Sequence, residues 1–117
     1  MSIPMPEQPV RGSKTGKPIM ALLDLLGRTW SLGIIWNLSE QVLTFRELQT
    51  RCDGISPTLL NTRLKELRVT KIVEKTGKGY ALTAIGEKLL LLIYPMGDWA
   101  NEWRDHLSVV KRSNNNG

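Results

Sequence analysis

The sequence predicts a single, mainly α-helical domain that carries one small β-hairpin. Apolar residues recur at three- and four-residue intervals through most of the chain, which is typical of helices with one buried face. Two short β-like runs, residues 72–75 and 79–82, flank a glycine-containing turn, as in a hairpin. The length of 117 residues suits one domain, and a chain of this size can bury a core without disulfides or metals.

The chain divides into an arm, a folded unit and a tail. Residues 1–17 contain repeated prolines and glycines with little periodic apolar content, so we expect a flexible basic arm. Residues 18–110 form the predicted domain, which includes terminal helices suited to dimerisation. Residues 111–117 end in an asparagine-rich stretch and are predicted to be a disordered tail.

Two helices are predicted at the start of the domain. Pro18 can occupy a first helical position, where its missing N–H costs nothing, and helical periodicity extends to about residue 27. The second helix is predicted from residue 28 or 29 to about residue 40. Its predicted buried face consists of Trp30, Ile34, Ile35 and Leu38.

The next two helices have stronger start signals. The stretch TFRE at 44–47 has the form of a capping box, and it predicts a short helix that ends near Cys52. Ser56 and Pro57 combine an N-cap hydroxyl with a proline at the first helical position, so they predict a longer helix over residues 57–69. The leucines at 60, 64 and 67 are predicted to face the core.

Two more helices are predicted after the hairpin. Thr83 is the predicted cap of the first, whose apolar face is expected to consist of Ile85, Leu89, Leu92 and Ile93. The second runs from residue 97 to about residue 110 and carries Trp99 and Trp103 in one stripe. This stripe either seals the core of the monomer or meets the same stripe of a second subunit, and we favour the second subunit.

The order of these elements is that of a winged helix-turn-helix. In such a unit the helix after the turn enters the DNA major groove, and the hairpin reaches a neighbouring part of the duplex. Charge supports this interpretation, because residues 56–80 contain six Lys or Arg against Glu66 and Glu74, while the whole chain carries a net +5. The sequence therefore predicts a polyanionic partner on this segment.

The predicted recognition helix presents polar side chains to solvent. If its leucines face inward, Asn61 and Lys65 face outward, where Asn can pair with adenine and Lys with guanine acceptors. Arg46, Lys75 and Lys78 are better placed for phosphates than for bases. The predicted DNA-binding residues are Arg46, Ser56, Pro57, Thr58, Asn61, Thr62, Lys65, Lys75 and Lys78. A solvated face that binds nothing is the alternative.

Residues 17–103 resemble the HxlR-type branch of winged-helix transcription regulators, which are relatives of the MarR group. The matching stretches are LDLLGRTW at 23–30, TFREL at 44–48, GISPTLLNTRLKEL at 54–67 and YALTAIG at 80–86. The resemblance implies a homodimer that binds an inverted repeat as repressor or activator. The dimer interface expected from the terminal helices consists of Ile19, Leu22, Leu23, Leu92, Trp99 and Trp103.

The sequence departs from that family pattern in three places. Lys17 stands where family members often have a sensor cysteine, so thiol sensing by that route is not expected. Thr70 and Lys71 replace the usual Asp-Gly before the wing, so a non-glycine residue is expected in a left-handed conformation. The hairpin is shorter than the family norm; its tip at 76–79 is placed to reach phosphate, and minor-groove reading by the wing stays open.

The predicted function is that of a cytoplasmic, homodimeric, sequence-specific transcriptional regulator that binds double-stranded DNA with helix 57–69 in the major groove of an inverted-repeat operator. The alternative is a winged-helix protein–protein interaction module, and a small-molecule effector of unknown identity is compatible with the first hypothesis. No paired acid/base or metal-ligand arrangement appears, so no enzyme activity, cofactor or metal site is predicted. Cys52 is expected to be a buried small hydrophobe, with a reactive thiol as the alternative. The longest apolar run, residues 89–93, is far too short for a membrane span.

Overall fold

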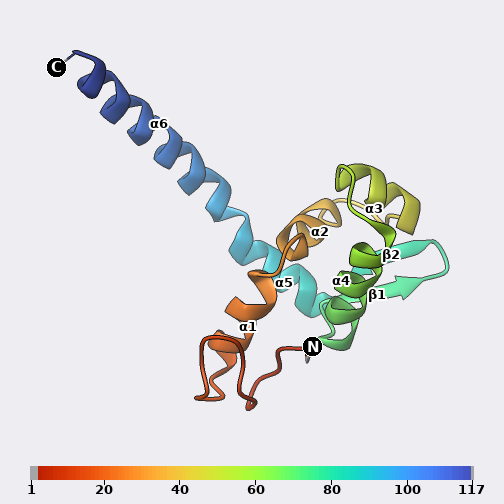
Figure 1. Cartoon of the computed structure of the whole chain (residues 1–117). Helices are drawn as coiled ribbons and strands as arrows, with labels where there is room; N and C mark the ends of the chain where they lie inside the picture. The colour runs from red at the N-terminus through yellow and green to blue at the C-terminus, as the bar shows by residue number, and fades with distance from the viewer. Residues whose placement is uncertain (1–2, 117) are drawn as a thin grey trace. The chain divides into compact units, whose positions relative to one another are not determined.

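The structure of the chain is a computed structural model that describes residues 3–116, with side chains described as far as residue 109. It confirms the mainly helical fold with one small antiparallel hairpin (Figure 1). The elements follow in the order α1 (Pro18–Leu26), α2 (Ser31–Asn37), α3 (Phe45–Arg51), α4 (Pro57–Val69), β1 (Val73–Thr76), β2 (Gly79–Leu82), α5 (Ala84–Ile93) and α6 (Pro95–Asn116). The chain forms two compact units, one up to Glu87 and one from Lys88.

The core of the first unit lies among α2, α3, α4 and the hairpin. The three α4 leucines that the sequence predicts to be buried are buried, and Ile34 and Ile35 of α2 are fully enclosed. The fully buried apolar side chains of this core are Ile34, Ile35, Leu43, Leu48, Cys52, Leu60, Leu64, Leu67 and Val73. Because all three leucines point one way, the opposite side of α4 is left for polar residues.

Both predicted helix caps are confirmed. The Thr44 hydroxyl accepts a hydrogen bond from the Glu47 N–H at 3.1 Å, and the Glu47 carboxylate accepts one from the Thr44 N–H at 2.9 Å. The Ser56 hydroxyl accepts from the Leu59 N–H at 3.1 Å, with Pro57 in the first turn of α4. These local bonds define where α3 and α4 begin, and so they determine the geometry of the helix-turn-helix.

The hairpin is fastened near its turn to the segment before α3. Strand β2 pairs antiparallel with β1, and Tyr80 also exchanges two backbone hydrogen bonds with Leu43, at 2.7 and 3.0 Å. The neighbouring Gly79 has a φ of 139°, and a Cβ there would lie 2.5 Å from the Leu43 carbonyl oxygen. Only glycine therefore fits at this crossing.

The second helix is shorter than predicted. Trp30 has a left-handed φ of 74° and is the N-cap residue, so α2 begins directly after it, at Ser31 rather than at residue 28 or 29. The Trp30 ring lies against Gly33, where a Cβ would be 3.0 Å from the ring. Ile34, Ile35 and Leu38 are buried as predicted, but Trp30 is only partly buried.

The helices after the hairpin differ from the prediction in face and length. Ile93 is buried as predicted, but Ile85 and Leu92 are 62% and 73% exposed and Leu90 is buried instead, so the predicted apolar face of α5 is wrong in part. Helix α5 ends in a continuous apolar run, in which periodicity cannot mark one face. Helix α6 begins at Pro95, two residues earlier than predicted, and continues to Asn116, beyond the predicted end near residue 110. The predicted disorder of the tail stays a prediction.

The N-terminal arm forms a closed loop. The Glu7 N–H donates to the Gly16 carbonyl at 2.8 Å, and Val10 and Ser13 exchange two backbone hydrogen bonds inside this loop. The predicted flexibility of the arm stays a prediction. Among the described residues, no single helix is long and apolar enough to cross a membrane, although α1 and α2, bent by 83° relative to each other, meet the length and composition criteria as a pair.

Candidate nucleic-acid interface

The outer face of α4 is a ridge of polar side chains, which we call the recognition ridge: Thr58, Asn61, Thr62 and Lys65. All four are exposed, whereas the leucines on the opposite side of α4 are buried. The other predicted DNA-binding residues, Arg46, Ser56, Pro57, Lys75 and Lys78, are also exposed. The structure therefore leaves every predicted contact residue accessible, while contact with DNA stays a prediction.

Hydrogen bonds within the helix distinguish the members of the recognition ridge. The Thr62 hydroxyl donates to the Thr58 carbonyl at 3.0 Å, so Thr62 presents its methyl group and an acceptor oxygen to a partner. The side chains of Asn61 and Lys65 form no hydrogen bond or ion pair with the described part of the chain. Their donors and, for Asn61, the acceptor are free for an external partner.

The first turn of α4 adds donors beside the ridge. The Ser56 oxygen accepts a hydrogen bond from the helix backbone, which leaves its O–H proton able to donate outward. Free backbone N–H groups and the positive end of the helix dipole lie in the same turn. This end of the helix is suited to an anion such as a phosphate.

The wing holds two cations in place. The Lys75 ammonium lies 5.8 Å from the centroid of the buried Tyr80 ring, a cation–π distance that keeps its stem along the strand. At the turn, the Thr76 hydroxyl donates to the Gly79 carbonyl at 3.0 Å and accepts from the Lys78 N–H at 3.1 Å. The exposed Lys78 is therefore carried by a well-bonded turn.

Arg63 does not belong to the outward charge of the basic segment. Its Nε donates to the Thr29 carbonyl at 2.7 Å, and its guanidinium pairs at 3.0 Å with Glu66, which is only 5% exposed. Glu66 also pairs with Arg28. The Arg63–Glu66 pair removes one charge of each sign, so the remaining side chains over residues 56–80 still carry +4.

A second buried carboxylate extends this ionic cluster to the arm. Asp24 of α1 is 7% exposed and lies 3.9 Å from Arg28 and 3.3 Å from Arg11, whose backbone N–H also binds it at 3.2 Å. Arg11 therefore ties the arm to α1, although its side chain stays 70% exposed. The ionic cluster of Arg11, Asp24, Arg28, Arg63 and Glu66 joins α4 to α1 and the arm. Two local sequence signals pointed to parts of it, the four-residue spacing of Asp24 and Arg28 and the three-residue spacing of Arg63 and Glu66.

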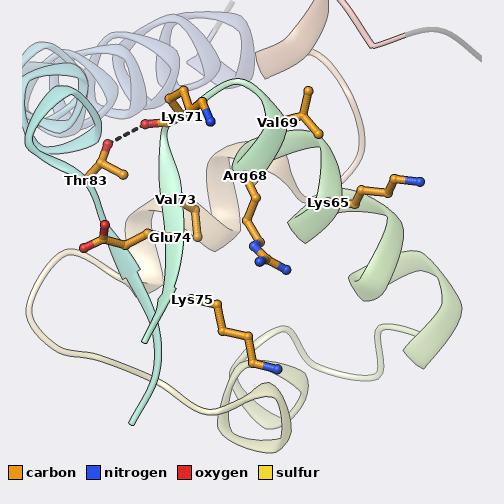
Figure 2. Close-up of a pocket in the computed structure, with 8 residues that line it drawn as sticks. All are labelled: Lys65, Arg68, Val69, Lys71, Val73, Glu74, Lys75 and Thr83. Carbon is orange, nitrogen blue, oxygen red and sulfur yellow. Dashed lines mark hydrogen bonds between the residues drawn. The ribbon is translucent and has the colours of Figure 1, made fainter. Parts of the chain in front are cut away.

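A groove that the sequence did not predict runs between α4 and β1. It has a volume of about 550 Å³, and Figure 2 shows Arg68 and Lys75 reaching into it from its two walls. We call it the basic groove; its cations are Lys65, Arg68, Lys71 and Lys75, and its one acid is Glu74. Lys71, at the turn between α4 and β1, has a φ of 67°, which confirms the left-handed residue expected there.

The single cysteine lies in the core. Cys52 is fully buried, as the sequence predicts, and burial raises the pKa of its thiol, which disfavours the nucleophilic thiolate. Within the described residues, no group of three or more His, Cys, Asp or Glu side chains is arranged to hold a metal ion.

Comparisons with known proteins match most of the chain. A family model described as HxlR-like helix-turn-helix matches residues 25–108. The HTH-type transcriptional regulator MJ0925 of Methanocaldococcus jannaschii is 28% identical over 90 residues, which cover 74% of this chain and 85% of that protein. The quinone-bound YodB structure from B. subtilis is 33% identical, with a TM-score of 0.68 over 72% of this chain and 96% of that one. A possible HxlR family transcriptional factor from Thermoplasma volcanium is 28% identical, with a TM-score of 0.64 over 70% and 80% of the two chains.

Proposed function

The chain belongs to the family of HxlR-like helix-turn-helix proteins and is a transcriptional regulator of the helix-turn-helix type, and from that premise we propose that it binds a specific DNA operator as a homodimer. Each subunit places α4 in the major groove, and the two copies of α4 occupy successive grooves about 34 Å apart on an inverted repeat. Such a regulator acts where the chromosome is, so a cytoplasmic location is part of the proposal.

The recognition ridge is the observation that carries this proposal. Asn61 has the donor and acceptor that match adenine, and Lys65 has donors for the acceptors of guanine. The Thr62 methyl group suits the methyl group of thymine. Because the leucines behind the ridge are buried, α4 presents these groups on a supported face.

Exposed groups that suit phosphate contacts support the same orientation of α4 on the duplex. Ser56 and the first turn of α4 offer donors at one end of the ridge, and Arg46 is exposed in the first turn of α3. Lys75 and Lys78 extend the positive surface along the wing. These contacts set the position of the protein on the duplex, while the ridge selects the bases.

Exposed apolar side chains support a homodimer. In the first unit, α1 exposes Ile19 and Leu23, with Leu22 partly buried. In the second unit, Leu92, Trp99 and Trp103 are exposed, and the two tryptophan rings stack with centroids 5.7 Å apart. Apolar surface of this extent is typical of an interface, and we propose a second copy of the chain as its cover.

Replacing Trp103 with Glu tests the dimer. The added charge should prevent burial of the stripe, so sedimentation should give a monomer while circular dichroism keeps the signal of the folded first unit. Asp98→Glu, an exposed change on the same helix that preserves charge, is the matched control and should leave the dimer intact. A wild-type chain that sediments as a monomer at micromolar concentration would contradict the homodimer.

Selection of bound duplexes from a random pool tests the proposed function. We expect recovery of an inverted repeat whose half-sites lie about one helical turn apart. Recovery of a single unrepeated half-site would contradict the dimeric arrangement. If the protein binds no duplex even at low salt, DNA binding is wrong, and the alternative of a protein–protein interaction module gains support.

A further inference from the structure

We propose that the basic groove binds the DNA backbone, with Arg68, Lys71 and Lys75 as donors to its phosphates. This inference rests on the proposed function and adds a second contact surface to it. Arg68 and Lys71 were not among the residues that the sequence predicts for DNA, because the groove forms only when α4 and β1 come together.

The four cations of the basic groove have no acidic partner in the described part of the chain, and the Lys75 ammonium lies over the Tyr80 ring. In residues 3–109, the ion pairs of the structure involve none of its four cations, and Glu74 is its only acid. Like charges held close together repel one another, so an anion that enters the groove is attracted by all four. The planar guanidinium of Arg68 can bind two oxygens of one phosphate at once.

The position of the basic groove relative to the recognition ridge favours DNA as the source of that anion. Arg68 follows Asn61 by seven residues, about two helical turns, so it lies on the same side of α4 as the ridge. Lys65 belongs to both surfaces. Figure 2 shows Arg68 on α4 and Lys75 on the wing at the two walls of the groove. With the ridge in the major groove, one strand of the duplex would pass the end of α4 and meet Arg68 and then Lys75.

Lys71 provides an independent argument. Its left-handed φ of 67° occurs where a helix commonly ends in glycine, and glycine would adopt this conformation with less strain. The Thr83 hydroxyl donates to the Lys71 carbonyl at 2.5 Å, a bond to the backbone that any residue at position 71 could accept (Figure 2). The lysine side chain is therefore not needed for the turn, and a strained residue that lines a charged groove points to a role in binding.

Binding measured by fluorescence anisotropy against salt concentration tests the proposal, with the selected operator and a random duplex as probes. We expect each of three variants to weaken binding to the operator and to the random duplex by equal factors: Arg68→Gln, Lys75→Gln and Lys71→Gly. Each should also reduce the slope of log affinity against log salt by about 1, the value for one lost phosphate contact. Lys88→Gln, an exposed lysine outside the groove, is the matched control and should leave the slope unchanged.

Lys71→Gly separates binding from folding. The glycine relieves the backbone strain, so the melting temperature should stay the same or rise while DNA affinity falls. If the Lys71 side chain were structural instead, the Lys71→Gly variant would have a lower melting temperature than the wild-type protein and the same salt slope for DNA binding. That result would overturn the role of Lys71 in the basic groove.

A free phosphate compound has the same chemistry as the DNA backbone, so tripolyphosphate is tested separately by calorimetry. One outcome combines three results: tripolyphosphate binds tightly, Arg68→Gln abolishes this binding, and the variants keep wild-type affinity for DNA. In that case the groove holds a free ligand, and the proposal that it binds the DNA backbone is wrong. If the wild-type protein binds DNA and the salt slopes of the variants are unchanged, the proposal fails and the proposed function stands. If the wild-type protein binds no duplex, both fail.

Discussion

The two faces of α4 differ in what they contact and in what holds them. The inner face carries Leu60, Leu64 and Leu67 together with Glu66, which pairs with Arg63 on the same helix and with the distant Arg28. The outer face carries the recognition ridge, whose residues Asn61 and Lys65 have no polar partner among the described residues. The inner face of α4 thus contributes to stability and the outer face is available for recognition. Substitutions on the inner face should lower stability, and substitutions on the outer face should change binding.

The largest expected effect is on the inner face, at Glu66. Glu66→Ala leaves the charges of Arg28 and Arg63 without this buried acid, so the free energy of unfolding should fall by about 3–5 kcal/mol. Urea denaturation followed by circular dichroism measures it. Glu74→Ala, at an exposed glutamate, should change stability by less than about 0.5 kcal/mol. Equal losses from the two variants would show that the ionic cluster contributes little.

On the outer face, Asn61→Ala should leave the melting temperature unchanged because the side chain is exposed and unbonded. If Asn61 reads a base, preference at one position of each half-site should relax by about 1–3 kcal/mol, measured by competition with single-base variants of the operator. Lys78→Ala, at the wing tip, provides the contrast and should weaken all duplexes alike. Uniform weakening by Asn61→Ala as well would place Asn61 against phosphate rather than a base.

Ser56 caps the start of α4 and is exposed there, so its variants separate stability from DNA binding. Ser56→Ala removes the cap of α4 and should lower the free energy of unfolding by about 1 kcal/mol. Ser56→Asp keeps a capping oxygen, so stability should be retained, but its negative charge should repel phosphate and weaken DNA binding. Thermal melts and anisotropy on the same two variants measure both quantities. If Ser56→Asp bound DNA as well as the wild-type protein, the first turn of α4 would not face a phosphate.

The smallest expected effect is the pH response of the α3 cap. The hydrogen bond from the Thr44 backbone N–H lowers the pKa of Glu47 below its ordinary value of 4.5. Because the pKa is lower in the folded state, the bond stabilises the protein above pH 4.5 and this stabilisation is lost as pH falls through the folded pKa. Melting temperatures between pH 6 and about 3 should therefore fall less steeply for Glu47→Gln than for wild type. Parallel curves would contradict this.

Local signals in the sequence predicted the elements that carry the recognition ridge. The capping box at Thr44, the Ser56 cap and the leucine spacing of α4 each depend on residues within one or two turns, and the structure confirms all three. The left-handed residue before the wing, found at Lys71, was expected from the family resemblance, because Thr70 and Lys71 replace the usual Asp-Gly.

Features made by distant residues were not predictable from local patterns. Arg28 meets Glu66 across 38 positions of sequence, so nothing near Glu66 indicated that it would be buried. The basic groove was also not predicted, because its two walls belong to different elements that meet only in the folded chain. The predicted apolar face of α5 was wrong at Ile85 and Leu92, because a continuous run of leucines has no periodicity that marks one face.

The crossing of β2 and the segment before α3 has a consequence for how an operator can be fitted. Tyr80 and Leu43 share two backbone hydrogen bonds, and Gly79 leaves no room for a side chain at the crossing, so the hairpin is fixed to the segment that leads into α3 of the helix-turn-helix. A hairpin that is fixed in this way cannot move to fit a duplex of unsuitable curvature. We therefore expect the flexibility of the DNA itself, at base pairs that no side chain reaches, to decide among sites that share the same contacted bases.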